Sequence, residues 1–188
     1  MAEELVDIME NFDLSEKELG GANLDLGDIH LGIKECQVSL VGKVKGEKIM
    51  NFVGVKNFVN SVWGYPRDIR IMELGANLFQ FHIPCEEDRD KILNGGPWVL
   101  DNQLLVVRNW YEGVEEDEEA FNLAPLWVKI WNLPVHWISK EIGRKIGKVF
   151  YEVRDAIVPQ IGGKKGRHLE ILVTADISQP LLRGRMSK

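Results

Sequence analysis

Cysteine is scarce in this sequence. Only Cys36 and Cys85 occur among 188 residues, too few for a disulfide framework or a Cys-rich zinc site. Long apolar runs are also missing: the longest aliphatic run, residues 104–107, is far shorter than the roughly 18 residues of a membrane span. The acidic N-terminus has neither the basic nor the apolar segment of a signal or transit peptide. We therefore expect a nuclear or cytoplasmic protein that is neither secreted nor membrane-inserted.

Charge is distributed unevenly along the chain. The net charge of −6 is typical of an ordinary acidic protein. Residues 140–188, however, hold eleven Lys and Arg against five Asp and Glu, a net +6, whereas the other 139 residues carry −12. This asymmetry suggests that the C-terminal part faces a polyanion. The alternative is a solvated segment whose charge is incidental.

The hydrophobic pattern predicts an α+β chain whose first half is a ferredoxin-like module at residues 36–110. Period-two alternation indicates strands and i, i+3/i+4 spacing indicates helices. The predicted order of strand, helix, strand, strand, helix, strand (βαββαβ) is that of the ferredoxin-like split βαβ fold. The expected elements are a strand from Cys36, a helix between Asn51 and Gly64, strands at 69–74 and 77–83, a helix after Pro84 and a strand at 103–110.

The same pattern divides the rest of the chain. We expect an acidic flexible arm at 1–34, an acidic linker at 111–123, a βαββ extension at 124–176 and a basic tail at 177–188. In the extension, Ser139 is expected to cap a helix whose apolar stripe is Ile142, Ile146 and Val149. The extension either completes the first sheet or is a degenerate second copy that lacks its last helix and strand.

Several separated segments resemble one plant family. They are LVGKV at 40–44, ELGANLFQFHI at 73–83, EEDRDKILNGGPW at 86–98, LLVVRNW at 104–110, APLWVKIWNLPVHW at 124–137 and ISQPLLRG at 177–184. The chain is similar over these segments to the domain of unknown function that precedes a CCHC zinc knuckle in proteins derived from LINE-type retrotransposons. The resemblance implies an RRM-like domain in a Gag-like, nucleic-acid-associated protein. No knuckle ligands precede Lys188, so the resemblance gives no reason to expect bound zinc.

The predicted first sheet lacks a surface for stacking bases. RRM proteins read RNA with aromatic side chains on the exposed face of their two central strands. Here Phe79, Phe81 and Ile83 share one strand face and are predicted to be core, whereas Gln37 and Ser39 are the expected outward residues of the first strand. If the module binds RNA, we expect loops, backbone contacts or another surface to do so.

Two sets of residues are candidates for nucleic-acid contact. The first set lies on one face of a predicted strand and consists of Trp127, Lys129 and Trp131. The two rings could stack bases, and the lysine between them could contact a phosphate. Alternatively, both tryptophans pack the second unit onto the first. A second set is basic, with three residues four apart on a helix and three in the following turn, a pattern suited to phosphates or to a solvated surface. Its members are Lys140, Arg144, Lys148, Lys164, Lys165 and Arg167.

Catalytic motifs are absent or incomplete. The GRKIGK stretch at 143–148 lacks the glycine spacing and the Ser or Thr of a P-loop. His168 and Glu170 match the His-x-Glu of zinc deaminases, but no Pro-Cys-x-x-Cys completes that site. We therefore predict a protein that is not an enzyme and needs no cofactor or metal. Its predicted function is sequence-tolerant binding of RNA or single-stranded DNA; the alternative is a protein-interaction or self-assembly module, such as a homo-oligomer, without nucleic-acid affinity.

Overall fold

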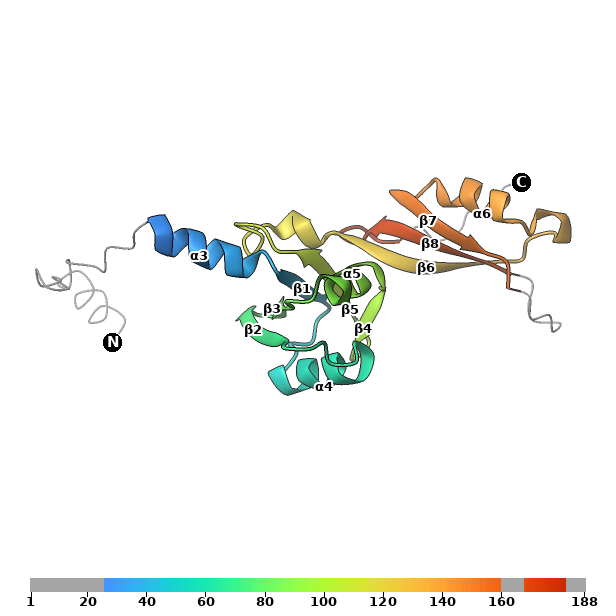
Figure 1. The fold of residues 1–188 in the computed structure, drawn as a ribbon. Helices are drawn as coiled ribbons and strands as arrows, with labels where there is room; N and C mark the ends of the chain where they lie inside the picture. Colours follow the sequence, from blue (N-terminus) through green and yellow to red (C-terminus); the bar gives the residue numbers. More distant parts are fainter. Residues whose placement is uncertain (1–25, 160–167, 182–188) are drawn as a thin grey trace, which may run out of the picture. The chain divides into compact units, whose positions relative to one another are not determined.

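The computed structural model describes residues 26–159 and 168–181 (Figure 1). The chain divides into two units, Met1–Lys34 and Glu35–Lys188. Helix α3 (Leu26–Cys36) includes Cys36, which the sequence pattern assigned to a strand. No helix within the described residues is both long and apolar enough to cross a membrane.

The first part of the larger unit is an antiparallel sheet with two helices, as the sequence predicts. Its strands are ordered β2-β3-β1-β5-β4, the split βαβ arrangement with one short edge strand, β4, that the sequence analysis missed. The elements are β1 (Ser39–Lys45), α4 (Phe52–Val62), β2 (Arg70–Gly75), β3 (Leu78–His82), α5 (Glu86–Asn94), β4 (Trp98–Leu100) and β5 (Gln103–Asn109).

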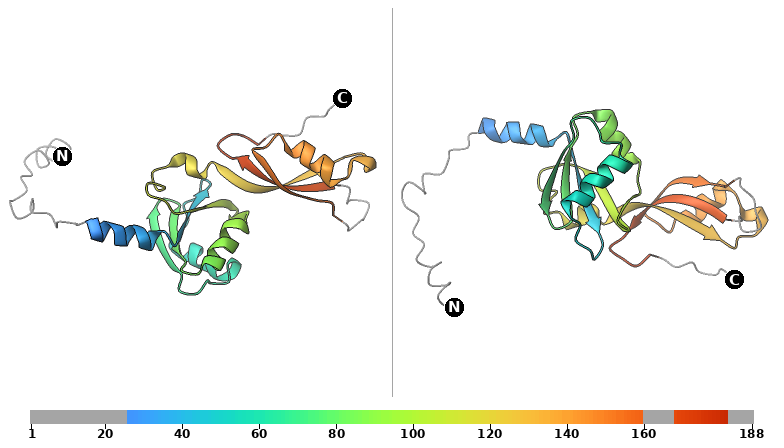
Figure 2. Two further views of the ribbon diagram at one scale, coloured as in Figure 1. Left: turned by 45° about the horizontal axis from the view of Figure 1, so that its top comes forward. Right: turned by 90° about the horizontal axis from the view of Figure 1, so that it is seen from below.

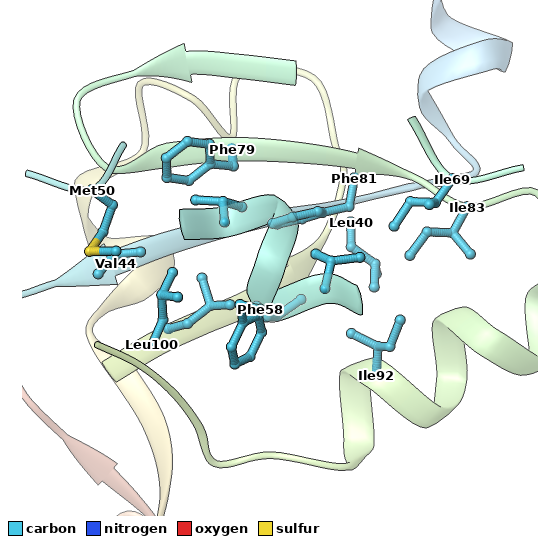
Figure 3. Close-up of a cluster of buried hydrophobic side chains, with 14 residues drawn as sticks. Leu40, Val44, Met50, Phe58, Ile69, Phe79, Phe81, Ile83, Ile92 and Leu100 are labelled. Carbon is cyan, nitrogen blue, oxygen red and sulfur yellow. The ribbon is translucent and has the colours of Figure 1, made fainter. Parts of the chain in front are cut away.

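The main core lies between this sheet and helices α4 and α5. Phe79, Phe81 and Ile83 are fully buried there, which confirms the predicted face, and Figure 3 shows them beside Phe58 of α4 and Ile92 of α5. Local signals fix the helix starts. The Asn51 side chain accepts the Gly54 amide proton at 2.7 Å, and α5 has three acidic residues in its first turn, where the helix dipole favours negative charge.

The C-terminal part forms a separate three-stranded sheet, ordered β6-β8-β7. The predicted βαββ order is therefore confirmed, and the alternative that these strands complete the first sheet is wrong. The arrangement repeats the first three strands and first helix of a split βαβ unit. The elements are β6 (Leu123–Trp131), α6 (Lys140–Gly147), β7 (Glu152–Ile157) and β8 (His168–Asp176), with short 3-10 helices η1 (Glu118–Phe121) and η2 (Val135–Trp137).

Helix α6 covers one face of this sheet (Figure 2). Ser139 caps it as predicted, accepting the Ile142 amide proton. The predicted apolar stripe is only partly correct, because Val149 is 63% exposed and the buried helix positions are Gly143 and Gly147. A Cβ at Gly147 would lie 2.5 Å from a methyl of Val153. The glycines thus let the helix backbone approach the sheet closely.

Candidate nucleic-acid interface

The first sheet does not offer an open face. On the side away from α4 and α5, Val41, Leu78 and Val106 form an apolar layer. The segment after β5 covers this layer with Val114 and Phe121, both buried. The expected outward residue Ser39 is also buried, and its hydroxyl accepts a hydrogen bond from Gln80 at 3.1 Å. The central strands of this sheet are therefore partly closed by the chain's own acidic linker.

Polar contacts hold the linker in place. The Arg108 guanidinium of β5 donates to the carbonyl oxygens of Ala120 and Leu123. Asp117 accepts the Ala120 amide proton at 3.0 Å and the Tyr111 hydroxyl proton at 2.6 Å. These contacts, led by the Tyr111 hydrogen bond, lower the pKa of Asp117. The linker is consequently folded around its own charges.

Acidic linker residues lie beside two lysines of β1. A shallow pocket brings Glu115, Glu116 and Glu118 to the same surface as Lys43 and Lys45. Burial, and then the neighbouring Lys43 charge, lower the pKa of Lys45, while Glu118 acts in the opposite direction. Lys43 and Lys45, which could otherwise attract phosphate to this sheet, therefore already lie beside carboxylates of the linker.

The second sheet differs, because only one of its faces is packed. Leu169 and Ile171 of β8 point toward α6, where they approach the glycines of that helix. Residues of opposite parity on β6 and β8 point the other way. We call this surface the open face; it consists of Trp127, Lys129 and Trp131 on β6 and His168, Glu170 and Leu172 on β8.

Two tryptophans stand exposed on the open face. Trp127 is 41% and Trp131 is 51% exposed. They lie four residues apart on a strand, about 13 Å at the usual rise of about 3.3 Å per residue. Trp131 stacks on its cross-strand neighbour His168, with ring centroids 4.4 Å apart and planes at 25°. Both tryptophans therefore present part of their side chains to solvent.

A charged network lies between the rings. Lys129 is 3.2 Å from Glu170, and the ring nitrogen Nε2 of His168 is 2.9 Å from the same carboxylate. The hydrogen bond from His168, followed by that from Lys129, lowers the pKa of Glu170. The Lys129 charge is thus partly balanced in the unbound protein. The geometry suits stacking combined with exchange of a carboxylate for a phosphate.

The predicted site residues do not form one surface. Lys140, Arg144 and Lys148 are exposed on or next to α6, on the opposite side of the second sheet from Trp127 and Trp131. The other three predicted basic residues lie outside the described residues; they are Lys164, Lys165 and Arg167. Two distinct surfaces are therefore available on this sheet unit.

Sequence reasoning missed the part that His168 and Glu170 play on the open face. The sequence pattern relates both residues only to a deaminase motif, and among the residues that the structure describes no His, Cys, Asp and Glu side chains gather as a metal site. Their actual role follows from register, since His168 lies opposite Trp131 and Glu170 opposite Lys129. The period-two pattern of β8 was visible in the sequence, but its pairing with β6 was not.

Comparison with known families concerns the first sheet. Residues 32–118 match the family model of DUF4283, a domain of unknown function. The DUF4283 region runs from α3 through β5 and most of the linker that covers the first sheet. The open face of the second sheet lies beyond it. No curated protein matches the chain.

The chain is also similar in structure to several RNA-binding proteins. The N-terminal three RNA-binding domains of the yeast splicing factor Prp24 match 77% of this chain at 13% identity, with a TM-score of 0.31; the chain spans 56% of that protein chain. The RNA-binding domain of Hrp1 in complex with RNA matches 73% of this chain at 11% identity, with a TM-score of 0.32; the chain spans 81% of that protein chain. RNA-recognition domains 1 and 2 of Drosophila melanogaster Sex-lethal match 74% of this chain at 16% identity, with a TM-score of 0.29; the chain spans 85% of that protein chain.

Proposed function

We propose that this protein binds RNA or single-stranded DNA without catalysing a reaction and with little sequence preference. The observation that carries the proposal is the exposure of Trp127 and Trp131 on either side of Lys129 on an unpacked sheet face. Tryptophan is highly buried on average, so two exposed rings on one face call for a functional explanation. Single-strand binders combine such rings with a cationic path for the backbone.

Stacking accounts for the expected lack of sequence preference. Every base has a π-face, and each base stacked on an aromatic ring contributes roughly 1–3 kcal/mol. Trp127 and Trp131 each present a ring to solvent, while Lys129 between them supplies a charge for the intervening phosphate. Glu170 would release Lys129 as the phosphate arrives. The open face therefore supplies the base contacts.

Phosphate contacts would come from the basic set. Lys140, Arg144 and Lys148 form an exposed cationic stripe, and Lys164, Lys165 and Arg167 add further charge in the connection between β7 and β8. The wider setting follows from the resemblance of the separated segments given above. We place the chain in a Gag-like protein derived from a LINE-type retrotransposon.

The direct test measures affinity for a labelled oligouridine with the full chain. Trp127→Ala and Trp131→Ala should each weaken binding roughly 5- to 150-fold, from the loss of one stacked base. The matched control is Trp137→Ala, which removes an equally exposed tryptophan from η2 and should leave the affinity unchanged. Circular dichroism confirms that each variant folds. Equal affinities of wild type and both open-face variants would contradict the proposed site.

Salt dependence tests the electrostatic part. If four or five phosphates are contacted, the logarithm of the binding constant should fall with the logarithm of salt with a slope of roughly 3 to 3.5. Substituting Lys140, Arg144 and Lys148 together by alanine should lower that slope, because these residues are proposed phosphate contacts. A wild-type chain that fails to bind, or whose binding ignores salt, would refute the proposed function.

A further inference from the structure

Strand β6 has a partner on one edge only. Its nine residues pair with β8 in an unbroken antiparallel register from Leu123 to Trp131. Within the described residues no strand pairs with the opposite edge of β6, which forms one margin of the three-stranded sheet (Figure 1). Such an edge presents a row of backbone N–H and C=O groups that can template another strand.

The two margins of this sheet are not equivalent. At the other margin, β7 contains a register shift between Val153 and Asp155, and bulges of this kind discourage further pairing. The β6 margin is regular and carries large side chains on both faces. Pro125 has no amide proton, and the Leu123 carbonyl already accepts the Arg108 guanidinium. The segment free to pair is therefore residues 126–131.

We propose that residues 126–130 of this segment pair with the same residues in a second copy of the chain, antiparallel about a two-fold axis at Val128, with Trp131 opposite Pro125 of the partner subunit. Opposed side chains in an antiparallel pair point to the same face. This register sets Lys129 against Trp127 of the partner subunit and Leu126 against Ile130 of the partner subunit. Both contacts are favourable: Lys129 and Trp127 form a cation–aromatic pair, and Leu126 and Ile130 form an aliphatic pair.

The neighbouring registers are worse. Centring the pair on Lys129 opposes two like charges, which is destabilising. Centring it on Trp127 requires Pro125 and Leu123 to pair, and those positions lack a free donor or acceptor as described above. The segment is therefore complementary to itself in one register, which favours a second copy over an unrelated strand. The resulting isologous dimer has a continuous six-stranded sheet, with four open-face tryptophans around its axis.

Light scattering on the full chain tests the dimer. The measured mass should rise with concentration toward twice that of one 21.4 kDa chain. Two variants test the register through Leu126 and Ile130, which are half-buried and lie outside the open face. Leu126→Lys with Ile130→Lys opposes like charges and should give a monomer. Leu126→Glu with Ile130→Lys loses the same apolar groups but opposes unlike charges, so the dimer should persist.

Three outcomes would overturn the proposal. They are a wild-type mass of one chain at every concentration, equal association of the two variants, and a monomer that adds only an unrelated extended peptide at this edge. Hydrogen–deuterium exchange on the wild type needs no variant: amide protection over 126–131 should rise with concentration, and unchanged protection would also refute the pairing. Both variants retain Trp127, Lys129 and Trp131, so oligouridine binding by the monomeric variant separates this inference from the proposed function.

Discussion

Arg108 is the residue that ties the linker to the first sheet. Its side chain reaches from β5 to carbonyl oxygens 12 and 15 residues further along the chain. Burial lowers the pKa of this guanidinium, which is a cost, and the hydrogen bonds to Ala120 and Leu123 offset it. A side chain that satisfies two half-buried backbone carbonyl groups is difficult to replace.

Replacing Arg108 with alanine should therefore lower the free energy of unfolding. Removing the guanidinium takes the donor away from two half-buried carbonyl oxygens, and an unsatisfied buried group costs about 1–3 kcal/mol. Urea denaturation measures the change. Arg67→Ala, at an exposed position before β2, serves as the control and should stay within about 0.5 kcal/mol of wild type. A loss of the same size in both variants would show that Arg108 has no special role.

Glu170 makes the stability of the second sheet depend on pH. The hydrogen bonds from His168 and Lys129 lower its folded pKa below the ordinary value of 4.5. The stabilisation is thus present above pH 4.5 and is lost as the pH falls through the lower folded pKa. Urea titrations between pH 6 and roughly 3 should show a shallower decline for Glu170→Gln than for wild type. Superimposable profiles would contradict this assignment.

The same residue limits the charge that the open face offers. Glu170 lies 3.2 Å from Lys129 and would repel an approaching phosphate. Glu170→Gln should therefore tighten oligouridine binding by roughly 2- to 10-fold, with the gain largest at low salt. Fluorescence anisotropy measures it. Asp88→Asn, which alters a carboxylate 3.5 Å from Lys91 in α5, provides a comparison outside the second sheet; weaker binding by Glu170→Gln would contradict the exchange of carboxylate for phosphate.

At the scale of elements, helix α6 depends on glycine where the sequence pattern suggested aliphatic side chains. Gly143 and Gly147 are the buried positions of the helix, and Val149 is exposed. Periodicity counts apolar side chains, so it cannot recognise a contact made by backbone. The caps at Asn51 and Ser139, by contrast, were predictable, because a side-chain acceptor before an amphipathic run is a local signal.

Gly147→Ala should destabilise the protein although alanine is the better helix former. The added Cβ would lie 2.5 Å from Val153 Cγ2 and 3.2 Å from Ile171 Cδ1. Overpacking of this kind costs roughly 1–3 kcal/mol, against a propensity gain of about 1 kcal/mol. Thermal unfolding followed by circular dichroism measures the net effect. Gly32→Ala in α3, with nothing within 4 Å of the new Cβ, should not lower the melting temperature.

For the molecule as a whole, the sequence predicted the elements better than the surfaces. The order of strands and helices followed from periodicity and from turn residues, and the buried face of β3 followed from Phe79 and Phe81. The closure of the first sheet did not. Val114 and Phe121 are isolated apolar residues in an acidic stretch, so no pattern marks them as core. Likewise, helix spacing placed Lys140 and Arg144 together, but only the sheet topology separates them from Trp131.

Phe121 is expected to contribute strongly to the stability of the larger unit. Its side chain is 3% exposed and packs in the layer formed by Val41, Leu78 and Val106. Phe121→Ala should cost about 3–5 kcal/mol, the usual penalty for deleting a buried aromatic ring. Chemical denaturation measures this change. Val53→Ala, which truncates a 65% exposed residue, should change stability little; an equally small effect of Phe121→Ala would show that the linker is loosely attached.

The folded linker also bears on how the chain would be cut. An acidic connection such as residues 112–119 would ordinarily be an early target for a glutamate-specific protease. Cleavage requires a segment to extend into the enzyme's active site, and here Val114 and Phe121 anchor the connection at both ends. Each peptide bond between them becomes accessible only after local unfolding. Digestion at this connection should therefore be slow, and the two sheets should persist as one fragment rather than two.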